Sequence, residues 1–325
     1  MALGPDDWEV PVRAQPDPDD YVFDLDRALD AVVGLTARIP ADAYTAGTLG
    51  TERAGNGVLI RDDGIVLTIG YLITEAEEVW LTTNTGRVVP GHVLGYDQAT
   101  GFGLVQALGP LGARALKLGY GRTASPGTEV VIAGAGGRKR SLAGRIVARQ
   151  EFAGYWEYVL DDAMFTAPAH PHWGGTAIIG PAGDLLGIGS LQLQHQAAGR
   201  VLPLNMAVPI DLLQPIFDEL VTLGRVDRPP RPWLGLFATE DEGRVVVVGF
   251  AGNGPAQRAG LREGDAVLAV DGRPVGDLVA FFRAVWALGE AGVEVPLTLD
   301  REGDVFDVQV RSSDRARMLK ARKLH

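Results

Sequence analysis

The residues of this chain best suited to chemistry by type and spacing lie in the stretch HPHWGG, residues 170–175. His170 and His172 are separated by one residue, so on an extended segment both imidazoles point to the same side. Together with Asp161 or Asp162 they would suit a metal such as zinc. The same spacing also occurs in loops whose imidazoles only hydrogen-bond water, and we predict neither a metal nor any other cofactor.

Few side chains of this sequence could act as a nucleophile. The chain has no cysteine, which excludes thiol catalysis, disulfides and thiolate metal sites. Ser190 and His195 lie five residues apart on a strand-like run, which sends their side chains to opposite faces. No serine stands in a Gly-x-Ser-x-Gly elbow or before a Gly-Gly pair; the serines are Ser125, Ser141, Ser190, Ser312 and Ser313.

Composition limits the class of protein. The chain has 325 residues, of which 46% are hydrophobic, enough for two or three globular domains. The formal net charge of −11 repels phosphate backbones and argues against a nucleic-acid partner. No apolar run approaches the roughly 20 residues that span a bilayer. The acidic, proline-bearing start is unlike a secretory signal, so we expect a cytoplasmic protein, or a periplasmic one if a leader was removed.

The elements that must position these residues are mainly strands. Residues 1–20 are polar and aperiodic and are expected to be a disordered acidic arm. Leu25, Leu29, Val32 and Val33 fall at helical spacing and predict a helix that ends before Pro40. From about residue 45 to 205, short β-rich segments alternate with turns such as RDDGI and GPAGD, which favours an antiparallel barrel or sandwich.

The C-terminal part is predicted to be a separate domain. A helix within residues 209–224 should close the β-rich domain, with Pro215 either near its first turn or at a kink. Residues 225–232 are charged and rich in proline and predict a linker. Residues 233–313 alternate strands with a short and a longer helix, and residues 314–325 form a basic tail. The predicted domains therefore cover residues 21–224 and 233–313.

These features resemble the HtrA/Deg family, a trypsin-like double β-barrel followed by a PDZ domain, from about residue 45 to about residue 312. The PDZ resemblance is continuous over VVVVGFAGNGPAQRAGLREGDAVLAVDGRPVGD. The resemblance implies a mainly β protein with a trypsin-like double barrel and a small α/β PDZ domain.

In the family's PDZ domains, a glycine-containing loop captures a peptide's C-terminal carboxylate on backbone N–H groups. The stretch WLGL occupies that place here, and the helix that follows would wall the groove. The peptide would add as a strand beside residues 236–239. The predicted peptide-binding residues are Trp233, Leu234, Gly235, Leu236, Phe281 and Val285.

The protease half resembles the family in pattern but lacks its catalytic residues. The position of the histidine base holds Tyr71, and the carboxylate position holds Gly101, with Asp97 matching a turn aspartate. The nucleophile position holds Trp173. Two residues earlier, where a glycine N–H completes the oxyanion hole, Pro171 has no N–H to offer. Trp173 either plugs the vacated cleft or stays exposed as a binding anchor.

We therefore expect an HtrA-like pseudoprotease that acts as a peptide-binding scaffold or regulator. The alternative is an active serine endopeptidase whose catalytic residues have been assigned in the wrong register. The resemblance implies peptide C-termini as partners, an active HtrA-type protease as a further partner, and assembly as a trimer.

Overall fold

A computed structural model describes residues 8–197 and 199–320. The chain divides into two compact units. Among the described residues, unit 1 contains 8–150, 162–197 and 199–227, and unit 2 contains 151–161 and 228–320. Within the described residues, no helix has the length and apolar character that crossing a membrane requires.

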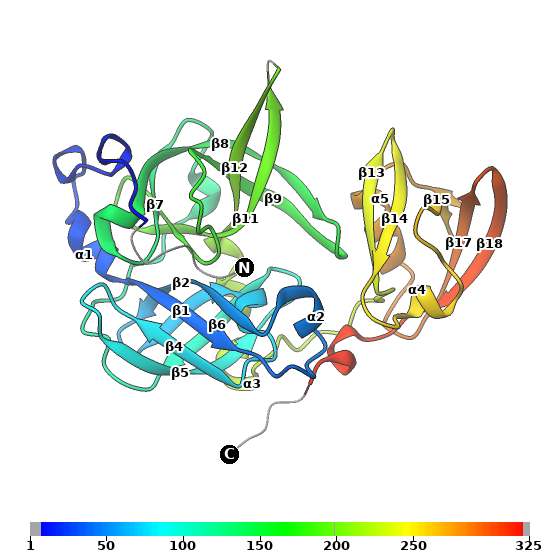
Figure 1. The fold of residues 1–325 in the computed structure, drawn as a ribbon, viewed down its shortest axis with the longest axis horizontal. Coiled ribbons are helices and arrows are strands. Elements are labelled where there is room, and N and C mark those ends of the chain that lie inside the picture. Colours follow the sequence, from blue (N-terminus) through cyan, green and yellow to red (C-terminus); the bar gives the residue numbers. More distant parts are fainter. Residues whose placement is uncertain (1–7, 198, 321–325) are drawn as a thin grey trace. The chain divides into compact units, whose positions relative to one another are not determined.

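Unit 1 begins with a closed six-stranded barrel in the order β1-β2-β3-β6-β5-β4, drawn in blue and cyan in Figure 1. Its short strand β3 is buried at every residue, as the apolar run predicts. Closure leaves no unpaired edge. The strands are β1 Val32–Arg38, β2 Glu52–Arg61, β3 Ile65–Ile69, β4 Glu78–Thr82, β5 Val88–Tyr96 and β6 Phe102–Ala107.

A second closed barrel follows in the order β10-β11-β12-β9-β8-β7, drawn in green in Figure 1. The two barrels and the predicted turns confirm the expected trypsin-like double-barrel architecture. The strands are β7 Glu129–Ala133, β8 Ser141–Gly154, β9 Tyr158–Ala167, β10 Ala177–Ile179, β11 Leu185–Ala197 and β12 Arg200–Pro209. Short 3₁₀ turns lie between strands of both barrels: η3 Gly70–Leu72 follows β3, η4 Gly121–Thr123 precedes β7, and η5 Gly137–Arg140 joins β7 to β8.

The N-terminal segment differs from its prediction. Residues 8–20 are not a disordered arm, because Val10 is buried in the second barrel and its N–H donates to Lys139 O at 2.8 Å. Two 3₁₀ turns follow, η1 Val12–Ala14 and η2 Pro18–Asp20. Residues 1–7 lie outside the described residues.

The predicted helix before Pro40 is also shorter than expected. It covers only α1 Leu25–Asp30, capped by Asp24, and Val32 begins strand β1. Pairing of β1 with both β2 and β4 satisfies its backbone in the barrel, and this tertiary pairing overrides the local helical spacing. A short helix α2, Ala46–Leu49, precedes β2.

Unit 1 closes with a broken helix rather than a continuous one. Two 3₁₀ turns, η6 Ile210–Leu212 and η7 Gln214–Ile216, precede α3 Phe217–Leu223, because Pro215 removes a backbone donor. Gly224, with φ +71°, ends α3 as predicted.

Unit 2 is a sheet in the order β13-β14-β15-β17-β18, with β16 paired to β15. The longer helix α5 buries Phe281 and Phe282 in its core and confirms the predicted α/β PDZ domain. The elements are β13 Leu236–Asp241, β14 Arg244–Phe250, α4 Pro255–Arg258, β15 Ala266–Val270, β16 Arg273–Pro274, α5 Leu278–Trp286, β17 Glu294–Arg301, β18 Asp304–Arg311 and η8 Arg315–Met318.

The unit boundaries differ from the predicted domains, because the predicted linker 225–232 is divided between the units and residues 314–320 of the predicted tail belong to unit 2. The end of β8, the turn after it and the start of β9 belong to unit 2, although they lie in sequence between strands of the second barrel. A strand prediction for residues 155–162 could not show this, because strand periodicity carries no information about which core a strand covers.

Candidate functional site

Tyr71, at the predicted base position, lies in η3 directly after β3. Its hydroxyl donates to Ser190 O at 2.8 Å. Burial raises the pKa of the Tyr71 hydroxyl above its ordinary value, and a hydrogen bond with the Trp173 side chain partly offsets that rise. Tyr71 therefore stays protonated near neutral pH and acts as a hydrogen-bond donor rather than a base.

Gly101, at the predicted carboxylate position, lies next to Tyr71. The N–H of Gly70 donates to Gly101 O at 2.6 Å. Asp97, which is 4% exposed, shapes the turn before β6 by accepting the N–H of Thr100 at 2.9 Å. The Asp97 carboxylate is thus engaged by its own turn, as the resemblance to a turn aspartate implies.

The loop at residues 170–175 is held by Asn56 of β2. The Asn56 amide group donates to His172 O at 2.9 Å and to Gly174 O at 3.0 Å. Gly175 has φ +78°, and a Cβ there would lie 1.8 Å from Asn56 O. The retained Gly-Gly pair therefore has a structural reason, since only glycine allows this approach.

The loop brings Trp173 beside Tyr71 but leaves an incomplete oxyanion pocket. A Cβ on Gly174 would lie 2.7 Å from the Tyr71 hydroxyl. Trp173 is partly buried, neither fully plugging a cleft nor fully exposed, and Pro171 is exposed. The structure thus brings together Tyr71, Gly101 and Trp173, and none of the three offers a base, an acid or a nucleophile.

The two histidines of the loop are in different environments. His170 is 1% exposed, its Nε2 donates to Arg140 O at 2.8 Å, and its Nδ1 accepts the N–H of His172 at 3.1 Å. Burial lowers the pKa of His170 to about 4, so this imidazole is neutral and both nitrogens are engaged. Burial also lowers the pKa of His172.

The surroundings of the two histidines also test whether they could ligate a metal together with Asp161 or Asp162. Trp8 packs its ring edge-on against both imidazoles, at centroid distances of 5.4 and 5.1 Å. Asp162 is paired with Arg149, and Asp161 belongs to unit 2. Among residues 8–197 and 199–320, no three His, Asp or Glu side chains gather as a metal would need.

The serines offer no replacement nucleophile in this geometry. Ser141 Oγ donates to Gly137 O, and Ser312 Oγ donates to Val293 O. Ser190 is 4% exposed, whereas His195 is exposed. In the described part of the chain, no serine hydroxyl is hydrogen-bonded to an imidazole.

In unit 2, the backbone of residues 234–236 surrounds a carboxylate. Glu157 Oε1 accepts the N–H of Gly235 at 2.7 Å, of Leu234 at 3.1 Å and of Leu236 at 3.3 Å, and Oε2 also accepts from Leu234 at 3.1 Å. Gly235 has φ +71°, and a Cβ there would crowd the Trp233 ring at 2.8 Å. The loop predicted to capture a carboxylate thus has the converging donors which that chemistry needs.

The other predicted peptide-binding residues are core residues. Phe281 and Val285 on α5 are 0% and 1% exposed and belong to the hydrophobic core of unit 2. Trp233 is 6% exposed and is bonded through its backbone to Ser313. The role of these residues in peptide binding stays a prediction, and in this structure Phe281 and Val285 are covered by the core of unit 2.

Glu157 has an unusual environment for an acid. It is 9% exposed, and burial raises its pKa to about 7, although the three backbone N–H groups and Arg315 oppose the rise. Neither Glu157 nor Asn56 was predicted from the sequence. Neither stands in a motif, and each contacts its loop from a segment far away in the chain, so the sequence carries no signal for either role.

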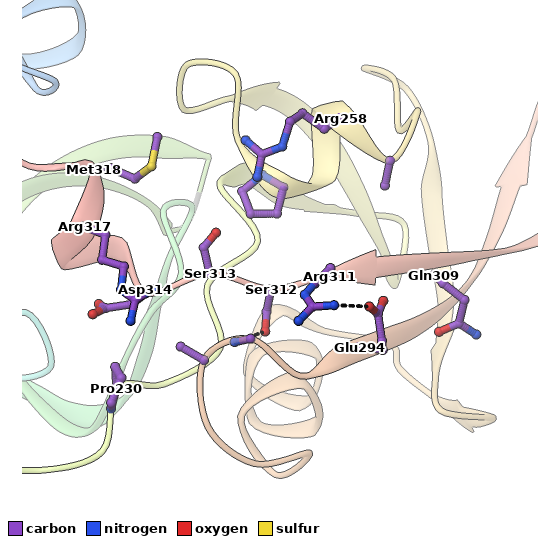
Figure 2. A pocket seen from close by; sticks show the side chains of 14 residues that line it. Pro230, Arg258, Glu294, Gln309, Arg311, Ser312, Ser313, Asp314, Arg317 and Met318 are labelled. Carbon is purple, nitrogen blue, oxygen red and sulfur yellow. Dashed lines mark hydrogen bonds and ion pairs between the residues drawn. The ribbon is translucent and has the colours of Figure 1, made fainter.

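A separate pocket of about 660 Å³ lies elsewhere in unit 2, beside η8 and β18. Figure 2 shows Arg311 directed toward Glu294, its partner on the neighbouring strand at 3.8 Å. Arg258, on the opposite wall, donates to Asn253 O. Arg311 and Arg258 of this pocket are thus both engaged by neighbouring acceptors.

Comparison with known proteins identifies both halves. Residues 55–188 match the family of trypsin-like peptidase domains, and residues 232–311 match the PDZ domain family. The chain is 26% identical over 80% of its length to a probable periplasmic serine endoprotease DegP-like of Pseudomonas fluorescens, and it spans 56% of that relative's length. It is 25% identical to the serine endoprotease DegS of Salmonella typhimurium, covering 90% of this chain and 85% of the relative.

Solved structures show the same fold. The HtrA-type protease AlgW with a tripeptide aligns with a TM-score of 0.52 at 20% identity, covering 92% of this chain and 97% of that one. A serine-to-alanine variant of AlgW, also with a tripeptide, aligns with a TM-score of 0.54 at 21% identity, covering 89% and 95%. At this identity the likeness supports the arrangement of elements, whereas the chemistry depends on the individual residues.

Proposed function

We propose, on the premise that the two matched domains and the curated relatives support membership of the HtrA/Deg family, that this chain binds protein C-termini through its PDZ domain without cleaving them. The observation that carries the proposal is the set of three backbone N–H groups at residues 234–236 that converge on one carboxylate. A free C-terminus presents the same chemical group.

Loss of the protease chemistry supports the second half of this proposal. A serine protease needs an activated nucleophile, an imidazole base and oxyanion donors. The corresponding positions hold Trp173, Tyr71 and Pro171, and the buried Tyr71 hydroxyl donates a hydrogen bond instead of accepting a proton. The barrels then serve as a scaffold rather than as a catalyst.

An active endopeptidase is the competing function, because the relatives carry that name. A fluorophosphonate probe distinguishes the two, since it labels only an activated serine. We expect no specific labelling of the folded chain, compared with strong labelling of an active serine endoprotease assayed beside it. Labelling that disappears on heat denaturation would show that the catalytic residues have been assigned wrongly.

Peptide binding is tested with an array of decapeptides that carry free C-terminal carboxylates, each printed beside its C-terminal amide. We expect binding only to members with the free carboxylate, because the amide cannot accept all the converging N–H groups. Equal binding to both forms would contradict recognition of the C-terminus.

The setting of this function follows from the relatives. The expectation of a cytoplasmic protein is not supported, because the DegP-like relative is named as periplasmic. We propose a periplasmic protein that assembles as a trimer and takes an active HtrA-type protease as one partner. Cell fractionation and light scattering of the purified chain test the compartment and the assembly, and a cytoplasmic monomer would contradict both.

A further inference from the structure

The carboxylate in the PDZ loop comes from the chain itself. Glu157 lies in the turn between β8 and β9, and residues 151–161 belong to unit 2 together with the loop. All three N–H groups of residues 234–236 donate to this one side chain. The loop that we propose for outside C-termini is therefore occupied by an internal acid.

The backbone of the same hairpin lies along the edge of the sheet. β13 is the edge strand of unit 2, and the N–H of Ala238 donates to Tyr155 O at 3.0 Å. Tyr155 of the hairpin contacts Ala238, and Glu157, two residues later, contacts Gly235, three residues earlier than Ala238. The hairpin segment and β13 with its loop therefore run antiparallel. An added strand whose carboxylate lies at the loop is how a bound peptide would be held.

Side chains hold the hairpin on both sides. The Tyr155 ring meets Phe237 of β13 at a centroid distance of 5.5 Å. On the other side, Arg283 of α5 forms ion pairs with Glu151 and Asp161. Ala153 and Val159 pack against the hydrophobic core to which α5 contributes. The hairpin thus contacts both β13 and α5, the two elements that would border a peptide groove.

The turn that carries Glu157 is in an uncommon conformation. Glu157 has φ +63°, in the left-handed region that costs an L residue about 1–2 kcal/mol. Trp156 stacks on Tyr158 at a centroid distance of 5.5 Å, and Gly154 leaves room for the Trp156 ring. The contacts with the loop and the sheet edge must offset this cost.

We propose that residues 154–157 are the resident ligand of the PDZ groove, with the Glu157 carboxylate in the place of a peptide's C-terminal carboxylate. An outside C-terminus then binds only when the hairpin leaves the groove. This inference rests on the proposed peptide-binding function and adds its regulation. The population of the undocked state sets the apparent affinity for any outside ligand.

Two measurements on the full chain test the proposal. The first is hydrogen exchange at the amides of residues 234–238. Glu157→Ala should lower their protection at least tenfold, because it removes the acceptor shared by three of them. Glu263→Ala, a matched change at an exposed acid that makes no contact with the loop, should leave protection unchanged.

The second measurement is the affinity for a labelled peptide QEFAGYW, which copies residues 150–156 and ends in a free carboxylate one residue beyond the Tyr155 carbonyl. Glu157→Ala should bind it at least tenfold more tightly than the unmodified chain, and the amidated peptide should bind to neither. Glu157→Gln keeps the size of the side chain and one carbonyl acceptor. In both measurements it should give values between those of the unmodified chain and those expected for Glu157→Ala. It keeps the proposal testable if the alanine variant unfolds.

The outcomes separate the two proposals. If both Glu157 variants keep the hydrogen-exchange protection of residues 234–238, the proposal of an internal ligand is overturned. Equal peptide affinity in the unmodified chain and both variants overturns the competition, while leaving peptide binding intact. If the Glu157 variants lose protection and none of the three proteins binds the peptide, the internal ligand is supported. The peptide-binding function then loses its support.

Discussion

The loops at residues 170–175 and 233–236 both depend on a glycine with positive φ, but they differ in what their backbone groups contact. In the first loop, the carbonyls of His172 and Gly174 accept from Asn56, and a proline stands where a donor is expected. In the second, three N–H groups remain directed at one carboxylate. The first loop therefore depends on side-chain contacts from β2, whereas the second depends on the direction of its own N–H groups.

The largest effect is expected where the first loop approaches β2. Gly175→Ala should destabilise unit 1 by about 3–5 kcal/mol, because overpacking adds to the strain of a positive φ. Gly137→Ala is the matched control, since it has φ +70° and no atom near the added Cβ. Its cost should be about 1–2 kcal/mol. Urea unfolding measures both, and equal costs would show that the approach to Asn56 does not constrain the loop.

The buried imidazole of the first loop should make unit 1 sensitive to acid. His170 has its pKa lowered to about 4 in the folded chain, against about 6.5 when unfolded. The unfolded state therefore binds more protons between these values, and stability falls as pH drops from 6.5 to 4, by about 3 kcal/mol. His170→Gln should reduce this slope to the part that His172 contributes, and His92→Gln at an exposed site should retain all of it. Urea midpoints at pH 7, 5.5 and 4.5 provide the test.

The contacts of Asn56 should account for a smaller part of the stability of the same loop. Asn56→Ala removes the side-chain partner of His172 O and of the N–H of Ala135, whereas Gly174 O keeps the backbone N–H of residue 56. The expected cost is about 2–3 kcal/mol. Asn84→Ala removes the bonds with Leu29 O and Gly136 N, which lie nearer to solvent, and should cost about 1 kcal/mol or less. If thermal unfolding ranks the two the other way, the Asn56 contacts are not what holds the loop.

The smallest expected effect is in the second loop, where docking of the hairpin should change with pH in the unmodified chain. Burial raises the pKa of Glu157 to about 7, so the docked hairpin binds a proton more strongly than the undocked one. Docking is then most favourable below the ordinary glutamate pKa and weakens as pH rises through 7. Carbon NMR of the Glu157 carboxyl should titrate near 7.

Hydrogen exchange sharpens that prediction. After correction for the intrinsic rate, protection of residues 234–236 should be several-fold higher at pH 6 than at pH 8. Glu157→Gln has no titrating group and should show no such difference. A Glu157 titration near the value of an exposed glutamate would mean that the hairpin does not stay docked in solution.

The sequence by itself predicted the two domains and gave the residue types at the expected catalytic positions. Strand runs separated by turns predict closed β structure, because periodicity and turn residues act locally. The identities of Tyr71, Gly101, Pro171 and Trp173 exclude triad chemistry at those positions, because the protonation and donor capacity of a side chain follow from its type. The role of the loop at residues 233–236 was implied only by the resemblance to PDZ domains.

Only the tertiary structure decided what occupies each loop. Strand β1 replaced part of a predicted helix because the barrel supplied partners on both edges. Asn56 and Glu157 reach their loops over 116 and 77 residues or more, and no local pattern encodes such contacts. Hydrogen bonds depend on distance and direction in space, so the carboxylate in the PDZ loop became visible only when the hairpin and the loop were folded together.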